Sequence, residues 1–195
     1  MICNFSLGPK RRGLLSFIPA LVASAALLAA GQASAQAKKP APPVKTAAVG
    51  GPAELAKFGD WAAYTANSGK ARTCYALGKP RERLPTSLKR DPGYVFISNR
   101  PGESVKNEVS IVMGFDVKPE SAAKAEMGSS SFDMIAKGAN LWVKNAAEES
   151  QFIEAMRKNQ RLVVKATSKK GNSTTDSYSL AGLLPAIDRI GKECQ

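Results

Sequence analysis

The strongest constraint on the fold of this chain is a series of short segments in which apolar and polar residues alternate. Along 109–116 nearly every second residue is apolar, which is the period of a strand with one buried face. The apolar stretch 94–97 contains β-branched and aromatic residues and lies between two Pro-Gly turn signals. These patterns predict strands there and also near 61–66, 72–78, 121–127, 131–136, 140–144, 161–168 and 173–179, with a turn at 169–172.

Two segments have helical patterns instead. Asn145 begins a capping-box-like pattern ahead of an apolar stripe, which predicts a helix over about 146–158. Asn159 suits a left-handed end to that helix. A second apolar stripe predicts a helix over about 183–191, with Pro185 confined to its first turn. Many short strands with two short peripheral helices predict a mainly β fold, either a single β-sandwich or a barrel-like sheet.

The first 35 residues have the pattern of a secretory signal peptide. A positive cluster, Lys10-Arg11-Arg12, precedes an apolar run over 13–30, and Ala33-Ser34-Ala35 offers the small residues of a cleavage site. An uncleaved anchor is the alternative, because the run approaches the spanning length of about 20 residues. Cleavage near Ala35 is favoured, which predicts a periplasmic or secreted protein that meets the membrane only through its signal peptide.

Residues 36–56 are rich in Pro, Ala and Lys, which predicts a flexible linker ahead of a folded domain over 57–195. The full chain has a formal net charge of +12, and three of its positive charges and no negative ones lie in 1–35, which leaves +9 for the remainder. A basic surface attracts polyanions. In an exported protein these would be polymers of the envelope or of a host-cell surface, and no nucleic acid is expected.

The composition argues against most enzyme classes. The chain has no histidine, which removes the commonest general base and the commonest transition-metal ligand. The scattered acidic residues suggest no catalytic pair, and no glycine-rich phosphate loop is present in the sequence. We therefore expect no enzyme activity, no cofactor and no metal, with lysine or carboxylate chemistry as the less favoured alternative.

Cys74 and Cys194 are the two cysteines that remain after loss of the leader. Two thiols in an oxidising compartment usually pair, so a disulfide is favoured over two separate thiols. Closing a loop of this size contributes about 4–5 kcal/mol in the chain-entropy model. Without a Cys-X-X-Cys spacing, a catalytic redox role is not expected.

The segment 70–106 concentrates positive charge. Within it, 79–85 has the composition of an exposed loop. A basic loop on a rigid sheet is suited to contact a polyanion, and a merely solvated loop is the alternative. The candidate contact residues are Arg81, Arg83, Lys89 and Arg90.

Three stretches together resemble the invasion-associated locus B family of bacterial exported proteins. They are Phe58-Gly59-Asp60-Trp61, Cys74-Tyr75-Ala76-Leu77, and Thr175 to Leu183 followed by Cys194. The resemblance covers roughly 57–194. It implies a small, β-rich, secreted or envelope protein linked to virulence through bacterial entry into host cells, without defining any chemistry. Many members have a further cysteine near 62–65 that this chain lacks, which leaves Cys74–Cys194 as the one possible pairing within a chain that has lost its leader.

The family motif residues are expected to be structural. Phe58 and Trp61 have large apolar areas to bury, Gly59 permits a tight strand entry, and Asp60 is suited to accept from nearby backbone donors. The later motif residues are Asp176, Tyr178 and Gly182.

These observations predict a non-enzymatic exported protein of this family that acts by binding at the envelope or the host-cell surface. The alternatives are a periplasmic housekeeping or stress protein with no invasion role, and an enzyme without histidine chemistry. The oligomeric state and the ligand are not specified by the sequence.

Overall fold

The computed structural model describes residues 51–68 and 71–195. This part of the chain is mainly β, with eleven strands in one antiparallel sheet and two α-helices. The strands are β1 Ala53–Phe58, β2 Trp61–Ser68, β3 Ala71–Gly78, β4 Glu82–Leu84, β5 Tyr94–Arg100, β6 Val105–Val112, β7 Ala123–Met127, β8 Ser130–Lys137, β9 Asn140–Val143, β10 Arg161–Thr167 and β11 Ser173–Ser179. The helices are α1 Glu149–Lys158 and α2 Leu183–Glu193, with 3₁₀ turns η1 Pro101–Glu103 and η2 Ala146–Glu148.

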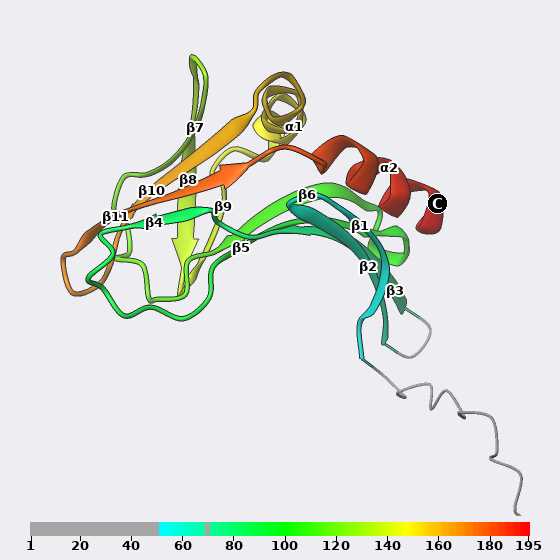
Figure 1. Ribbon diagram of the computed structural model, residues 1–195, viewed down its shortest axis with the longest axis horizontal. Helices are drawn as coiled ribbons and strands as arrows, with labels where there is room; N and C mark the ends of the chain where they lie inside the picture. Colours follow the sequence, from blue (N-terminus) through cyan, green and yellow to red (C-terminus); the bar gives the residue numbers. More distant parts are fainter. Residues whose placement is uncertain (1–50, 69–70) are drawn as a thin grey trace, which may run out of the picture. The chain divides into compact units, whose positions relative to one another are not determined.

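The strand order is β1-β2-β3-β5-β6-β9-β8-β7-β10-β11-β4. The sheet bends over itself, so that its two halves enclose one core, and α2 lies over β1, β2 and β3 (Figure 1). Helix α1 packs on β6, and the ring centroid of its Phe152 lies 4.9 Å from the ring centroid of Phe132 on β8. The predicted mainly β, sandwich-like fold with two helices is confirmed.

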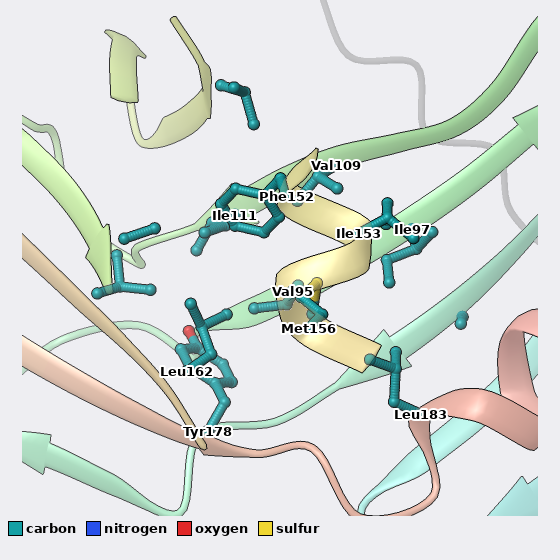
Figure 2. Close-up of a cluster of buried hydrophobic side chains, with 14 of the residues drawn as sticks. Val95, Ile97, Val109, Ile111, Phe152, Ile153, Met156, Leu162, Tyr178 and Leu183 are labelled. Carbon is teal, nitrogen blue, oxygen red and sulfur yellow. The ribbon is translucent and has the colours of Figure 1, made fainter. Parts of the chain in front are cut away.

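Alternation decides which side chains enter the core. On β5 and β6 the residues Val95, Ile97, Val109 and Ile111 are fully buried and face α1 (Figure 2). Their neighbours in the sequence point to the other face, because successive side chains of a strand alternate. On that outer face, Tyr64, Tyr75 and Phe96 from β2, β3 and β5 form a row of aromatic contacts across the strands.

The sheet extends beyond the predicted strands at two places. Strand β1 begins at Ala53, so the prediction that a flexible linker continues to residue 56 is wrong. The segment joins the fold because it pairs with β2, with Glu54 opposite Tyr64, and composition does not reveal such pairing. Residues 82–84 form the edge strand β4 and not an exposed loop.

One strand is shorter than its alternation suggests. Strand β6 ends at Val112, because Gly114 has a φ of +67° and lies against the backbone of Asp91. The chain therefore turns before Phe115, although the apolar alternation continues to that residue.

The helix ends agree with the sequence prediction only in part. The Asn145 side chain accepts from the backbone N–H of Ala147 and caps η2, which leads into α1. Asn159 is extended, with φ −117° and ψ 165°, so the predicted left-handed stop is wrong. Its side chain instead donates to the carbonyl oxygen of Ala155, 2.8 Å away. Helix α2 runs two residues beyond its predicted end, and Pro185 lies in its first turn as predicted.

The predicted signal peptide, its cleavage near Ala35 and the linker up to residue 50 lie outside the described residues. None of the helices in residues 51–68 and 71–195 combines the length and the apolar character of a membrane-spanning segment.

Candidate anion-binding site

The two ends of the predicted family motif meet in the structure. Trp61 is 1% exposed and donates from its indole nitrogen to the carbonyl oxygen of Ser179, 2.9 Å away. Gly182 has a φ of +90°, and a Cβ at this position would overlap the backbone carbonyl of Phe58. The motif residues therefore join the turn between β1 and β2 to the start of α2, which is a structural role.

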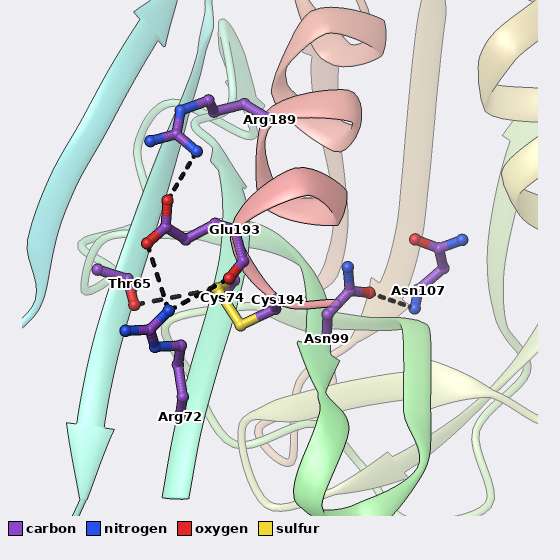
Figure 3. Close-up of a disulfide and its surroundings, with 8 residues drawn as sticks. All are labelled: Thr65, Arg72, Cys74, Asn99, Asn107, Arg189, Glu193 and Cys194. Carbon is purple, nitrogen blue, oxygen red and sulfur yellow. Dashed lines mark hydrogen bonds and ion pairs between the residues drawn. A yellow bond between two sulfur atoms is a disulfide. The ribbon is translucent and has the colours of Figure 1, made fainter.

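Cys74 and Cys194 form a disulfide, which confirms the predicted pair. Their Cα atoms are 5.9 Å apart, and the bond ties the C-terminal end of α2 to β3 (Figure 3). Arg72 reinforces the connection by donating to the backbone carbonyl of Glu193. This end of the domain is therefore held by a covalent bond and by polar contacts of Arg72.

A second set of contacts surrounds Asp176 in the middle of β11. Its carboxylate is fully buried and accepts from Arg83 Nε at 2.9 Å and from Arg90 Nη1 at 2.7 Å. Arg83 lies directly opposite Asp176 in the β4–β11 pairing, which brings the two side chains together. A buried carboxylate requires such charged donors, because desolvation without them costs several kcal/mol.

The neighbouring hydroxyl of Tyr178 is buried and has no hydrogen-bond partner among the described residues. Burial, and then the negative charge of Asp176, raise the pKa of this phenol above its usual range. Tyr178 therefore stays neutral and packs in the core beside Leu162 (Figure 2).

Next to the Asp176 cluster lies a hollow of about 330 Å³, which we call the basic hollow. Three segments form it: the loop before β5, the turn after β6, and the β10–β11 hairpin. Its lining residues are Leu88, Lys89, Arg90, Phe115, Asp116, Ser168, Lys169, Lys170, Asn172 and Thr174. Four of these are cationic and one is acidic, and that acid, Asp116, is paired with Lys169 at 3.1 Å. The excess of positive charge favours an anion in the hollow.

The floor of the basic hollow differs from its rim. The Arg90 side chain is only 5% exposed, and its guanidinium carbon lies 5.9 Å from the centroid of the Phe115 ring, within cation–π range. Lys89 and Lys170 are exposed and form no ion pair with another described residue. The hollow thus combines one nearly buried guanidinium with solvated ammonium groups.

The structure separates the four residues predicted as one polyanion contact. Lys89 and Arg90 line the hollow, whereas Arg81 lies elsewhere and pairs with Asp60 at 2.7 Å. The prediction that Arg83 lies in an exposed loop and contacts a polyanion is wrong. Arg83 donates to Asp176 and to the carbonyl oxygens of Asp91 and Met113, both at 2.6 Å, so its donors serve the fold.

Asp60 also differs from its predicted role. Its carboxylate accepts from the side chain of Arg81 and not from nearby backbone donors. The hydrogen bonds from Arg81, and then from Ser179, lower the pKa of Asp60 below its usual range.

Sequence reasoning missed Lys169 and Lys170, which it treated only as part of a hairpin turn. The pair of adjacent lysines at a turn was the available signal. Their partnership with Lys89 and Arg90 depends on the fold, because about 80 positions separate the two segments. No group of three or more possible metal-ligating side chains occurs among residues 51–68 and 71–195.

Comparison of the chain with protein-family models, with curated proteins and with solved structures gave no match. The resemblance to the invasion-associated locus B family therefore stays a prediction from the motifs.

Proposed function

We propose that this chain is an exported, non-catalytic binding protein that contacts an anionic polymer of the cell envelope or of a host-cell surface through its basic hollow. The observation that carries the proposal is the lining of the hollow, where four cationic residues from two distant segments accompany one acidic residue. Arg90 and Lys169 are paired with Asp176 and Asp116, and Lys89 and Lys170 form no ion pair with another described residue. Such a concentration of charge on a folded scaffold attracts polyanions and holds them by salt-dependent contacts.

Two further observations support export and surface binding. The Cys74–Cys194 bond is of a kind that persists in oxidising compartments. The motifs at 58–61 and 175–183 resemble those of an exported family linked to host-cell entry. In this proposal the domain works by contact, with no covalent step.

The test is binding to immobilised polysaccharides at increasing salt. A sulfated polysaccharide and a polyuronate are compared with neutral dextran, using the exported form of the chain. We expect both acidic polymers to bind and the neutral one not to bind, with affinity falling as salt rises. Equal retention on neutral dextran, or no retention on either acidic polymer, would contradict the proposal.

A matched pair of variants separates the hollow from net charge. Lys89→Ala with Lys170→Ala removes two rim cations, and Lys57→Ala with Lys137→Ala removes two exposed cations that do not line the hollow. Both double variants lose the same net charge. We expect the first to weaken binding about tenfold more than the second, the scale of one charge-assisted contact. Equal losses of affinity in the two double variants would show that binding depends on overall charge and not on the hollow.

A further inference from the structure

The placement of Arg90 is unusual for a residue that serves only the fold. Its side chain is 95% buried, it lines the basic hollow, and within the described residues it donates one side-chain hydrogen bond, from Nη1 to Asp176 Oδ1. A guanidinium has five N–H donors in a planar fork. Arg83, by contrast, uses its donors on three different acceptors of the fold.

Asp176 fixes where the remaining Arg90 donors lie. Its Oδ1 atom binds Arg90 while its Oδ2 atom binds Arg83, so the two guanidinium groups share one carboxylate. One negative charge does not neutralise two positive ones. An anion in the hollow would therefore meet an oriented donor fork that still carries excess positive charge, with Lys89 and Lys170 at the rim.

The wall of the hollow is apolar on one side. Leu88 and Phe115 line it beside Arg90, and Ser168, Asn172 and Thr174 supply polar groups from the hairpin. An aromatic face beside an anion-binding fork suits an anionic group attached to a ring whose face is apolar. A sugar that bears a sulfate or a carboxylate has this chemistry, and a bare inorganic anion would not cover the part of the Phe115 ring that lines the hollow.

We propose that the basic hollow is a pocket for a single acidic sugar unit, in which Arg90 binds the oxyanion group, Asp176 positions Arg90, and Phe115 packs against the sugar ring. This inference rests on the proposed function and adds the ligand unit and the residue that selects it. The contact with the polymer would then be a specific one, made at one pocket, and not a diffuse attraction along the surface.

The first experiment needs no variant. The guanidinium N–H signals of Arg90 and Arg81 are followed by NMR while the unaltered protein is titrated with a sulfated disaccharide, its unsulfated counterpart, inorganic sulfate, or anionic phospholipid vesicles. We expect the Arg90 signal to move with the sulfated disaccharide and, more weakly, with inorganic sulfate. The Arg81 signal is the internal control and should stay in place.

Two variants identify the roles. Arg90→Lys keeps the charge and removes the fork, so the affinity for the sulfated disaccharide should fall about tenfold or more. Phe115→Leu keeps an apolar wall and removes the aromatic face. The affinity for the disaccharide should therefore fall about 2–10-fold, while the affinity for inorganic sulfate stays the same. Rescue of Arg90→Lys by a higher concentration of the same disaccharide would show that its fold is intact.

Several results would overturn the inference. An Arg90 signal that stays in place with every acidic ligand would exclude the pocket even if salt-dependent polymer binding persists, and the proposed function would then stand without it. Movement of Arg90 with vesicles alone would assign the site to lipid headgroups. Equal effects of Phe115→Leu on the disaccharide and on inorganic sulfate would remove the ring contact. Failure of all acidic polymers to bind would remove both proposals.

Discussion

Two arginine–aspartate contacts in this domain have the same chemistry and opposite surroundings. Arg81 meets Asp60 at the surface, with the arginine side chain 66% exposed. Only nine positions later, Arg90 meets Asp176 in the interior, where the side chains are 5% and 0% exposed. Water screens the charges of the first pair, whereas the buried charges of the second pair are compensated only by the protein groups around them. Spacing and residue type therefore say little about what an arginine contributes until its surroundings are known.

The largest expected effect comes from breaking the buried contact. Asp176→Asn keeps the shape of the side chain and leaves the guanidinium groups of Arg83 and Arg90 without their counter-charge. Removing one partner from a buried ion cluster costs about 3–5 kcal/mol of the free energy of unfolding. Denaturation in urea measures this loss. Asp60→Asn is the matched control, with a much smaller expected loss of stability. Comparable losses in the two variants would show that the buried contact contributes no more to stability than the exposed one.

A similar comparison applies to the backbone. Gly182 and Gly171 have φ values of +90° and +84°, but a Cβ on Gly182 would overlap the carbonyl of Phe58, whereas a Cβ on Gly171 would have nothing within 4 Å. Both alanine variants carry the strain of positive φ, about 1–3 kcal/mol. Gly182→Ala should unfold at clearly lower urea concentration than Gly171→Ala, because it must also displace β1 from α2. Equal midpoints would mean that the contact between the two motifs is loose.

The smallest effect concerns the surface pair and its pH dependence. The hydrogen bond from Arg81 lowers the pKa of Asp60 below its ordinary value of 3.8. A depressed acid contributes stability above its unfolded pKa, and that contribution is lost as the pH falls through the lower folded value. Arg81→Met should raise the pKa of Asp60 in an NMR titration and leave stability at neutral pH nearly unchanged. An unaltered titration curve would show that the pair does not form in solution.

Much of the fold follows from local patterns. Strands such as β5, β6 and β11 are predictable because their signals act over a few positions: β-branched and aromatic residues between turns for β5, alternation for β6, and the preceding turn for β11. Strand β1 was missed because its Pro- and Ala-rich surroundings resemble a linker, and pairing with β2 is what orders it. The end of β6 was missed because Gly114 reverses the chain against Asp91, a contact that no alternation reveals.

The candidate site was predictable only in part. The basic composition of 70–106 drew attention to Lys89 and Arg90, which line the basic hollow, and the export pattern suggested the disulfide. The surroundings of Arg83 and Arg90 depend on Asp176, which lies 93 and 86 positions away in the sequence. The hairpin lysines depend on the same long-range assembly. The charge of each residue was visible in the sequence, but its burial was not.

The disulfide changes the outcome of proteolytic cleavage of this domain. Because Cys74 and Cys194 are 120 positions apart, one cut anywhere between them leaves two fragments that are still covalently joined. Such a nicked molecule would keep its mass, apart from one added water, and would separate into two pieces only after a reductant reached the bond. Cleavage of the backbone at an exposed hairpin would thus leave all strands in one covalently linked molecule.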